Sequence, residues 1–406
     1  MSGPLSGIRI VDLSRVLAGP WASQLLADFG AEVIKIEKPG AGDDTRHWGP
    51  PWLSDRDGKP TRESAYFLAT NRNKLSITAN LSHPEGQKLV SELASQADVL
   101  LENFRVGTLA KFRLDAANLQ EQNPRLIYCS ISAYGQQGSR RSLPGYDAMM
   151  QAEGGLMSIT GEPATSGGQP QKVGVAIADI MTGMYAATAI LAALEARHTS
   201  GEGQYIDLSL YHSQVAWLAN QGQNFLMTGV SPGRLGTAHP NIVPYQSFRT
   251  ADGYVMLAVG NDRQFAACVD CMGIGDLAND ARYASNEKRV RNRDGLITTL
   301  SALFQEKSTA HWLDALAKVG VPAGRINDID AVLGGDYASE AGLIGQFRHS
   351  LSETVPMVTN PVNFSATPVE RRHAGPLLGE HTEQILTSRL GYSIEKIAGL
   401  RDRGAI

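Results

Sequence analysis

The chain has 406 residues, of which 42% are hydrophobic and 19% are charged, and its formal net charge is −4. This length exceeds what one hydrophobic core usually serves, so a folded protein of two domains is expected. The acidic balance argues against a nucleic-acid partner, because phosphate neutralisation needs a clustered basic excess. Three cysteines do not make a disulfide framework, and they indicate a reducing compartment.

The N-terminal sequence MSGPLSGIRIVDLSRV has no basic segment followed by an apolar one, so it lacks the pattern of a secretory signal. The longest apolar stretch, residues 184–194, is too short to span a bilayer. We therefore expect a cytoplasmic protein without a membrane partner.

The first part of the chain alternates between strand and helix patterns. Helices are predicted from Gly19 to Gly30 and over 83–96. Apolar strands are predicted at 8–13, 31–37, 75–81, 98–103 and 125–132, with one more at 205–208. Strands that alternate with helices form a mostly parallel sheet with helices on both faces. The predicted fold class is therefore α/β, with a Rossmann-like large domain.

The pattern changes after a Gly-rich stretch at 154–174. A strand-like apolar run, 173–178, leads into a long helical pattern that starts near Asp179, and a further helix is predicted at 211–227. Later elements are a hairpin with an Asp-Gly turn at 247–259, helices at 262–272, 289–304 and 310–319, and two helices that begin near residues 381 and 393. We expect a large domain, 1–224, completed by the C-terminal return 331–406, and a small α+β domain, 225–330.

Asp179 lies where the apolar run meets the long helix, and two interpretations fit it. An Asp at this boundary is commonly an N-cap, which accepts hydrogen bonds from free backbone N–H groups. It can also be a carboxylate nucleophile, which a helix N-terminus would keep ionised at neutral pH. The spacing alone favours the N-cap, although one side chain can serve both purposes.

Other familiar site patterns are missing from the sequence. Gly40-Ala41-Gly42 lacks the third glycine of a dinucleotide fingerprint, and there is no P-loop or Gly-x-Ser-x-Gly elbow. Asp43-Asp44 has no matching ligand cluster, so a turn and helix cap is favoured and no metal site is predicted. Cys268 and Cys271 lie within one helical pattern, which favours core packing over a redox or zinc site. Several basic residues follow the predicted strands, at the edge where an open parallel sheet binds ligands: Lys38, Arg46, Arg72, Lys74, Arg105 and Lys111.

A long ordered series of segments carries a resemblance to a known family. These segments are PLSGIRIVDLSRVLAGP, LLADFGAEVIKIEKPGAGDDTR, TNRNKLSI, DVLLENFRVGTL, PGYDAMMQAEGGLMSITG, ALEARHTSGEGQYIDLSL and PLLGEHTEQIL. The series resembles the class III CoA-transferases, of the formyl-CoA and carnitine CoA-transferase type. Within that family, GAGDDTRHWGPPW and GTAHPNIVPYQSF are similar to the group that moves CoA from succinyl-CoA to glutarate. Related enzymes act on itaconate, mesaconate and other small dicarboxylates, so the acceptor stays open.

The resemblance implies a chemistry and a set of residues. The family's nucleophilic aspartate matches Asp179, which would form an aspartyl–acyl anhydride and then an aspartyl-CoA thioester, without a metal or a permanently bound cofactor. The racemase branch carries His in a Gly-His-Asp segment, whereas this chain has Tyr146 there, which disfavours racemization. A non-catalytic acyl-CoA-binding protein is the remaining alternative. The implied contacts to coenzyme A are Arg15, Val16, Ala18, Lys38, Asn71, Lys74, Asn103, Phe104, Lys111 and Tyr134.

The same resemblance implies an interlocked homodimer. Backbone N–H groups for the oxyanions are expected in Gly-rich segments, at 236–239 and at 260–261. A dicarboxylate acceptor also needs a cation for its second carboxylate. The candidates for substrate binding are Arg46, Arg105, Arg234 and His239.

Overall fold

The structure is a computed structural model that describes residues 3–406, and the chain divides into two compact units. Unit 1 holds the residues up to Gly154, then Gly174–Trp217 and Ala338–Ile406. Unit 2 holds Gly155–Val173 and Leu218–Tyr337. The Gly-rich stretch after residue 154 therefore belongs to unit 2, although the sequence placed it in the large domain.

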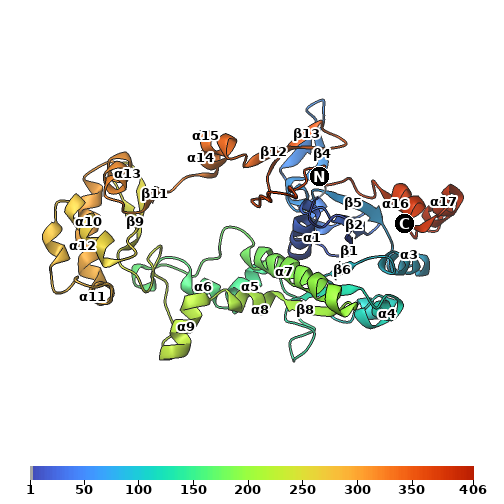
Figure 1. The fold of residues 1–406 in the computed structure, drawn as a ribbon, viewed down its shortest axis with the longest axis horizontal. Coiled ribbons are helices and arrows are strands. Elements are labelled where there is room, and N and C mark those ends of the chain that lie inside the picture. The colour runs from blue at the N-terminus through green and yellow to red at the C-terminus, as the bar shows by residue number, and fades with distance from the viewer. Residues whose placement is uncertain (1–2) are drawn as a thin grey trace. The chain divides into compact units, whose positions relative to one another are not determined.

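Unit 1 is built on a six-stranded parallel sheet (Figure 1). Its strands are β1 (Arg9–Asp12), β2 (Glu32–Glu37), β5 (Lys74–Thr78), β6 (Val99–Glu102), β7 (Ile127–Ser132) and β8 (Tyr205–Ser209). Their order across the sheet is β5-β2-β1-β6-β7-β8. The first three strands run outward from β1 in one direction and the last three in the other, which is the doubly wound order of the Rossmann fold. The α/β prediction is confirmed.

The sheet buries both faces, because successive side chains of a strand point to opposite sides. Val33 of β2, and the residues of the other strands that point to the same face, pack on helices α1 (Ala18–Asp28) and α7 (Ile177–Ser200). Ile34 and its equivalents pack on the opposite face, against α3 (Pro84–Ala94), α4 (Ala116–Gln122), α16 (Thr382–Leu390) and α17 (Ile394–Asp402). The C-terminal helices thus complete the core of the N-terminal sheet.

The remaining elements of unit 1 surround this sheet. Two small antiparallel sheets pair β3 (Trp52–Ser54) with β4 (Pro60–Ser64) and β12 (Ile344–Arg348) with β13 (Thr354–Val358). The short helices are α2 (Ala65–Leu68), α5 (Asp147–Glu153) and α8 (Leu210–Ala216). Short 3-10 turns lie at Asp44–His47 and Leu109–Phe112.

Unit 2 has a three-stranded antiparallel sheet, β11-β10-β9, covered by helices. The strands are β9 (Tyr245–Arg249), β10 (Tyr254–Ala258) and β11 (Ala323–Arg325), so the predicted hairpin is confirmed. Its helices are α6 (Leu156–Ile159), α9 (Ala219–Thr228), α10 (Asp262–Cys271), α11 (Asn286–Arg291), α12 (Arg293–Gln305), α13 (Thr309–Lys318) and α14 (Ile329–Gly334), and α15 (Asp336–Glu340) spans the boundary with unit 1. Phe304 stacks on Phe248, with ring centroids 4.6 Å apart, at the centre of this core.

Three sequence predictions need correction. The apolar run 173–178 forms no strand: residues 173–176 lie outside the sheet and residues 177–178 begin α7. The predicted helix 211–227 is two helices, α8 and α9, and the predicted helix 289–304 is interrupted at Asn292 between α11 and α12. Helix α7 is longer than the apolar stretch within it and, by length and composition only, could cross a membrane. Half of its most apolar 18-residue window is buried, and α7 packs on α1 as a core helix.

Candidate active site

A pocket of about 190 Å³ opens at the carboxyl ends of the central strands of unit 1. Its wall includes residues that follow β1 (Arg15 to Ala18), residues that follow β6 (Asn103 to Val106) and the end of β7. The strand order reverses between β1 and β6, and the crevice at such a reversal is where open α/β sheets bind ligands. Asp179 lines this pocket.

Asp179 lies in the first turn of α7, and it is not the N-cap of that helix. The helix begins at Ile177, its N-cap is Ala176, and no cap hydrogen bond comes from the capping residue's own side chain. Asp147, at the start of α5, caps the helix instead, because its Oδ1 accepts from the backbone N–H of Ala178 at 2.7 Å and from that of Asp179 at 3.3 Å. Among residues 3–406, none donates a hydrogen bond to the Asp179 carboxylate, so its oxygens are available to a reactant. The N-cap interpretation of Asp179 was therefore wrong.

The electrostatic setting of Asp179 also differs from the expectation. Burial raises the pKa of its carboxyl to about 7, and the negative charge of Asp147 adds to this increase. The helix N-terminus does not keep the group fully ionised at neutral pH, because only 8% of the residue is exposed and its neighbour carries the same charge. The result is a carboxylate that is more basic than an ordinary aspartate.

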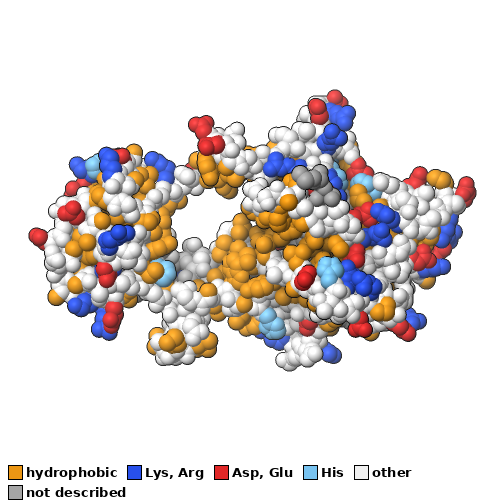
Figure 2. Space-filling view, viewed as in Figure 1, with side chains coloured by type: hydrophobic (Ala, Val, Ile, Leu, Met, Phe, Trp, Pro, Cys, Tyr) orange, Lys and Arg blue, Asp and Glu red, His pale blue; other side chains and the backbone are white. Residues whose placement is uncertain are grey.

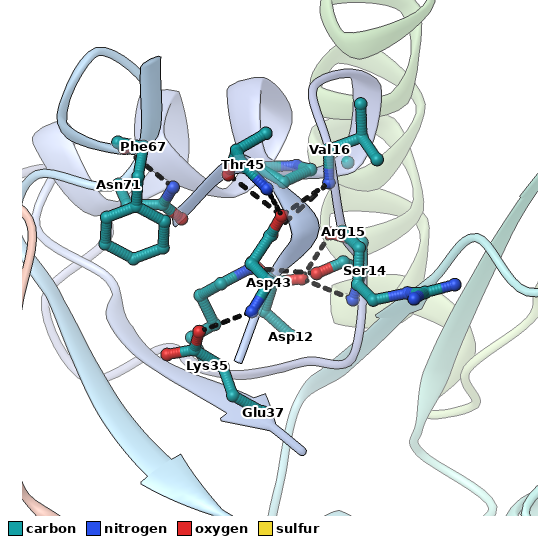
Figure 3. A network of polar contacts seen from close by, with 12 residues as sticks. Asp12, Ser14, Arg15, Val16, Lys35, Glu37, Asp43, Thr45, Phe67 and Asn71 are labelled. Carbon is teal, nitrogen blue, oxygen red and sulfur yellow. Dashed lines mark hydrogen bonds and ion pairs between the residues drawn. The ribbon is translucent and has the colours of Figure 1, made fainter. Parts of the chain in front are cut away.

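The loop after β1 forms the other side of the pocket and has a strained backbone. Val16 has a φ of 70°, in the left-handed region that a β-branched residue rarely adopts. Its N–H donates to the Asp43 carboxylate at 3.1 Å, and Asp43 also accepts from Lys35 Nζ at 2.9 Å (Figure 3). Asn103 fixes Arg15, the residue before Val16, because its side chain bonds both the N–H and the C=O of Arg15, at 2.9 and 2.7 Å. The loop is thus held from two directions before any ligand binds.

The sequence and structure of this chain match a known enzyme family. The sequence model of CoA-transferase family III matches residues 5–382. The chain is 48% identical to the succinate–glutarate CoA-transferase of Agrobacterium fabrum, over 94% of this chain and 95% of that protein. It is 43% identical to the succinyl-CoA:glutarate CoA-transferase of Mus musculus, over 97% of this chain and 89% of that protein. The crystal structure of a CAIB/BAIF family protein from Brucella suis superposes with a TM-score of 0.83 at 44% identity, covering 96% of this chain and all of that one.

The chain belongs to CoA-transferase family III. The resemblance seen in the sequence is confirmed, and so is the expected enzyme class.

The structure brings several of the predicted coenzyme A contacts of this transferase together. Arg15, Val16, Ala18, Asn103 and Phe104 line the pocket of Asp179. A neighbouring pocket of about 360 Å³ shares Arg15, Asp44 and Phe104 with it, and includes the exposed Lys38. The two pockets therefore offer one continuous wall for an extended ligand. Lys111 is exposed but lines neither of them, although the next residue, Phe112, lines the second.

Lys74, Asn71 and Tyr134 do not present free polar groups to either pocket. Lys74 Nζ is fully buried and donates to Asp12, to the C=O of Pro20 and to Asn71 Oδ1. Burial lowers the pKa of this ammonium to about 7. The Tyr134 hydroxyl donates to Glu153 at 2.9 Å. In this structure Lys74 therefore bonds Asp12 of β1, Pro20 of α1 and Asn71, and its predicted contact with coenzyme A stays a prediction.

Of the residues predicted to bind the substrate, one lines the pocket of Asp179 and the others are paired elsewhere or lie in unit 2. Arg105 lines the pocket of Asp179, as does Arg141, which the sequence did not suggest; neither forms an ion pair within residues 3–406. Arg46 is buried and paired with Glu37 and Glu63, at 2.8 and 3.0 Å, so it is not available to a substrate. Arg234 and His239 lie in unit 2, where Arg234 donates to the carbonyls of Glu162 and Gly168.

The backbone donors expected in unit 2 are mostly in use. The N–H of Gly236 donates to the C=O of Gly161, that of Ala238 to Leu235, and that of His239 to Tyr245. The N–H of Gly260 donates to the side chain of Gln264. In this conformation these groups do not form an open oxyanion hole.

Two functional residues escaped sequence reasoning. Asp43 was interpreted as a turn and helix cap, and this is confirmed because its carboxylate accepts from Thr45 N and Oγ1. The hydrogen bond that it accepts from Val16 N–H was not predicted. Asp147 was missed because its partners lie 31 and 32 residues further along the chain. The one signal available was Lys35, a charged residue within an apolar strand, which requires a buried carboxylate nearby. No cluster of His, Cys, Asp and Glu suited to a metal ion occurs in the described part of the chain.

Proposed function

We propose that this transferase moves coenzyme A from succinyl-CoA to glutarate, with Asp179 as the covalent nucleophile. The observation that carries the proposal is the Asp179 carboxylate: it has no hydrogen-bond donor within the described residues, and it lines the pocket at the strand reversal. The names of the Agrobacterium and mouse relatives support this donor and this acceptor.

The chemistry proceeds by acyl exchange on one carboxylate. An Asp179 oxygen attacks the thioester carbonyl of succinyl-CoA, the C–S bond breaks, and an aspartyl–succinyl anhydride and CoA thiolate form. The thiolate attacks the aspartyl carbonyl and releases succinate, which leaves an aspartyl-CoA thioester. Glutarate attacks that thioester and forms a second anhydride, and the returning thiolate attacks its glutaryl carbonyl. Glutaryl-CoA leaves and the aspartate is regenerated, so no metal or ATP is required.

The two adjoining pockets suit a coenzyme that stays bound through these steps. The thioester end belongs beside Asp179, and the nucleotide end belongs along the second pocket, where Lys38 supplies a positive charge for phosphate. Arg15 borders both pockets, but its guanidinium is paired with Asp44 at 3.0 Å. Binding a phosphate there requires that exposed pair to separate, which costs little because surface ion pairs are weak.

The second carboxylate of the acceptor needs a cation near Asp179. Arg105 and Arg141 both line that pocket and have no carboxylate partner among residues 3–406. We assign the distal carboxylate of glutarate to this pair. The same pair accommodates itaconate, mesaconate or other small dicarboxylates, which remain the alternative acceptors.

We also propose that the enzyme is a homodimer, interlocked as the family resemblance implies. Hydrophobic side chains gather on the visible face over α1 and α7 (Figure 2). Met184 and Tyr185 of α7 are exposed by 38% and 42%, and Val175, just before α7, by 54%. Unit 2 exposes Leu226 and Met227 of α9 by 75% and 78%. Exposed apolar surface of this kind marks an interface.

The test incubates the enzyme with succinyl-CoA and a panel of acids and detects new CoA esters by mass spectrometry. Glutaryl-CoA is expected, and Asp179→Asn and Asp179→Ala are expected to lose transfer while they still bind coenzyme A. Quenched wild-type enzyme should carry a covalent adduct on the peptide that contains Asp179. Robust turnover by Asp179→Ala would overturn the nucleophile assignment. Proton exchange at the α-carbon of a 2-methylacyl-CoA would instead favour the racemase alternative, and binding without transfer to any acid would favour a non-catalytic acyl-CoA-binding protein.

A further inference from the structure

Two carboxylates share the N-terminus of helix α7. The Asp147 carboxylate comes from α5 and bonds the N–H groups of Ala178 and Asp179, so it occupies the donors that the first turn of α7 offers. Its other oxygen accepts from Gln151 Nε2 at 2.6 Å, which fixes its orientation. Asp179, in the first turn of the same helix, receives none of these hydrogen bonds at its carboxylate. The backbone N–H groups at the positive end of the helix therefore stabilise the charge of Asp147, and neither of them bonds the Asp179 carboxylate.

We propose that Asp147 is a positioning residue for the transfer reaction: it holds the first turn of α7 in place, and its charge sets the pH range and the basicity of the neighbouring nucleophile. This inference rests on the proposed role of Asp179 and deepens it. It does not make Asp147 a catalytic residue, because its oxygens are occupied by Ala178, Asp179 and Gln151.

The charges around Asp179 leave Asp147 as the main electrostatic influence. The other titratable side chains that line the pocket are Arg15, Asp44, Arg105, Arg141 and Tyr146. Burial raises the pKa of the Tyr66 hydroxyl, and the charges of Asp179, Asp147 and Asp43 add to this increase. The elements packed on α7 carry further titratable groups, namely Asp28, Tyr128, Cys129, Glu153, Tyr205, Asp207, Tyr211 and His212. Of the described residues, Asp147 is the one whose charge contributes to the raised pKa of Asp179, after burial itself.

The consequence is a nucleophile matched to its leaving group. An ordinary aspartate, with a pKa near 3.8, is far less basic than the thiolate it must expel, whose thiol has a pKa of about 8.5. An aspartate with a pKa of about 7 comes much closer, so attack on the thioester is less unfavourable. The accompanying cost is protonation: below pH 7 most of the nucleophile is in its neutral, unreactive form.

The test compares the pH dependence of kcat/KM for succinyl-CoA in wild type and in Asp147→Asn. Asparagine removes the charge and keeps the bond to α7, because its side-chain oxygen still accepts from Ala178, although its amide nitrogen no longer accepts from Gln151. Removing the like charge of a neighbouring carboxylate lowers a pKa by about one or more. Relative to each enzyme's own plateau, the rate at pH 6 should therefore rise from about a tenth to about a half. The plateau above pH 8 should fall, because the nucleophile becomes less basic.

A purely structural role predicts another outcome, in which Asp147→Asn scales the rate equally at every pH and the midpoint of the acid limb stays in place. That result would overturn the proposal. Asp147→Ser, whose shorter side chain removes both the charge and the bond to Ala178, provides a second test of the midpoint, which is read independently of the plateau rate. Infrared spectra supply a readout without turnover: the protonated-carboxyl band that Asp179→Asn removes should titrate at lower pH in the Asp147 variants. The matched control is Asp252→Asn in unit 2, whose carboxylate accepts from Thr309 N–H at 2.7 Å and which should leave the midpoint unchanged.

Failure of this inference differs from failure of the proposed function. If Asp179→Asn and Asp179→Ala are inactive but the acid limb does not move in either Asp147 variant, the nucleophile stands and the role of Asp147 falls. If the Asp179 variants turn over normally, the covalent mechanism fails first, whatever the Asp147 variants do.

Discussion

Replacing Asp179 by Asn should stabilise the protein while it abolishes transfer. Burial and Asp147 raise the pKa of Asp179 from 3.8 to about 7 in the folded state. The folded protein therefore disfavours ionisation that the unfolded chain undergoes freely. Below pH 3.8 both states are protonated and there is no effect; the destabilisation grows as the pH rises to 7 and is complete above it. At about 1.4 kcal/mol for each unit of pKa, the full effect is on the order of 4 kcal/mol.

The pH dependence separates this effect from other consequences of the substitution. Asn is neutral in both states, so the stability gain of Asp179→Asn should be larger at pH 8.5 than at pH 5.5, by about 2 kcal/mol. For a unit of this size that corresponds to about 4 °C in Tm, measured by thermal unfolding at both pH values. Asp252→Asn serves as the control: hydrogen bonds from Thr309 lower the pKa of Asp252, so it is ionised in both states throughout this range. A gain for Asp179→Asn that is equal at the two pH values would refute the reasoning.

Three other substitutions test the site. Arg105→Ala and Arg141→Ala should each raise KM for glutarate tenfold or more, since a charge-assisted hydrogen bond is worth about 1.5–3 kcal/mol. Each should change KM for a monocarboxylate of the same length much less. An equal rise in KM for both acids would contradict the assignment. Asp43→Asn should raise KM for succinyl-CoA and destabilise unit 1 by about 3–5 kcal/mol, because it leaves Lys35 buried without its carboxylate and weakens the hold on Val16. Steady-state kinetics and denaturant unfolding measure both effects, and an unchanged unfolding midpoint would show that the Lys35–Asp43 pair does not stabilise unit 1.

The sheet could be predicted from sequence because its strands are buried on both faces and appear as continuous apolar runs. The run at 127–132 is an example, with every residue buried. The helix 211–227 was predicted as one piece because its composition is helical throughout, and periodicity does not locate a break between α8 and α9 that divides the two units. The run at 173–178 looked like a strand for the same reason that β7 did. In the structure residues 173–176 pair with no strand of the six-stranded sheet and residues 177–178 begin α7, which an apolar pattern of six residues does not reveal.

The site was predicted unevenly for a related reason. Spacing placed Asp179 at a helix start but favoured a cap, and only the family resemblance identified it as the nucleophile. What separates the two roles is which carboxylate bonds the first N–H groups of α7, and that depends on a contact between Asp147 and Ala178 across 31 residues. The direction of the Lys74 side chain depends on similar contacts: a lysine at the start of a strand can reach outward or inward, and three buried oxygen acceptors direct it inward.

The distribution of charge within unit 1 explains why Asp179 differs from the buried carboxylates that are paired with cations. Its buried cations are paired: Lys35 with Asp43, Lys74 with Asp12, and Arg46 with Glu37. Burial opposes ionisation of Asp12, Glu37 and Asp43 too, yet paired cations and hydrogen bonds lower the pKa of each below its usual value. Asp179 is buried to a similar degree, but a second carboxylate stands where a lysine would stabilise it. A cation in that place would raise stability and lower the basicity of the nucleophile, so the same feature that makes Asp179 costly to ionise is the one that fits it to attack a thioester.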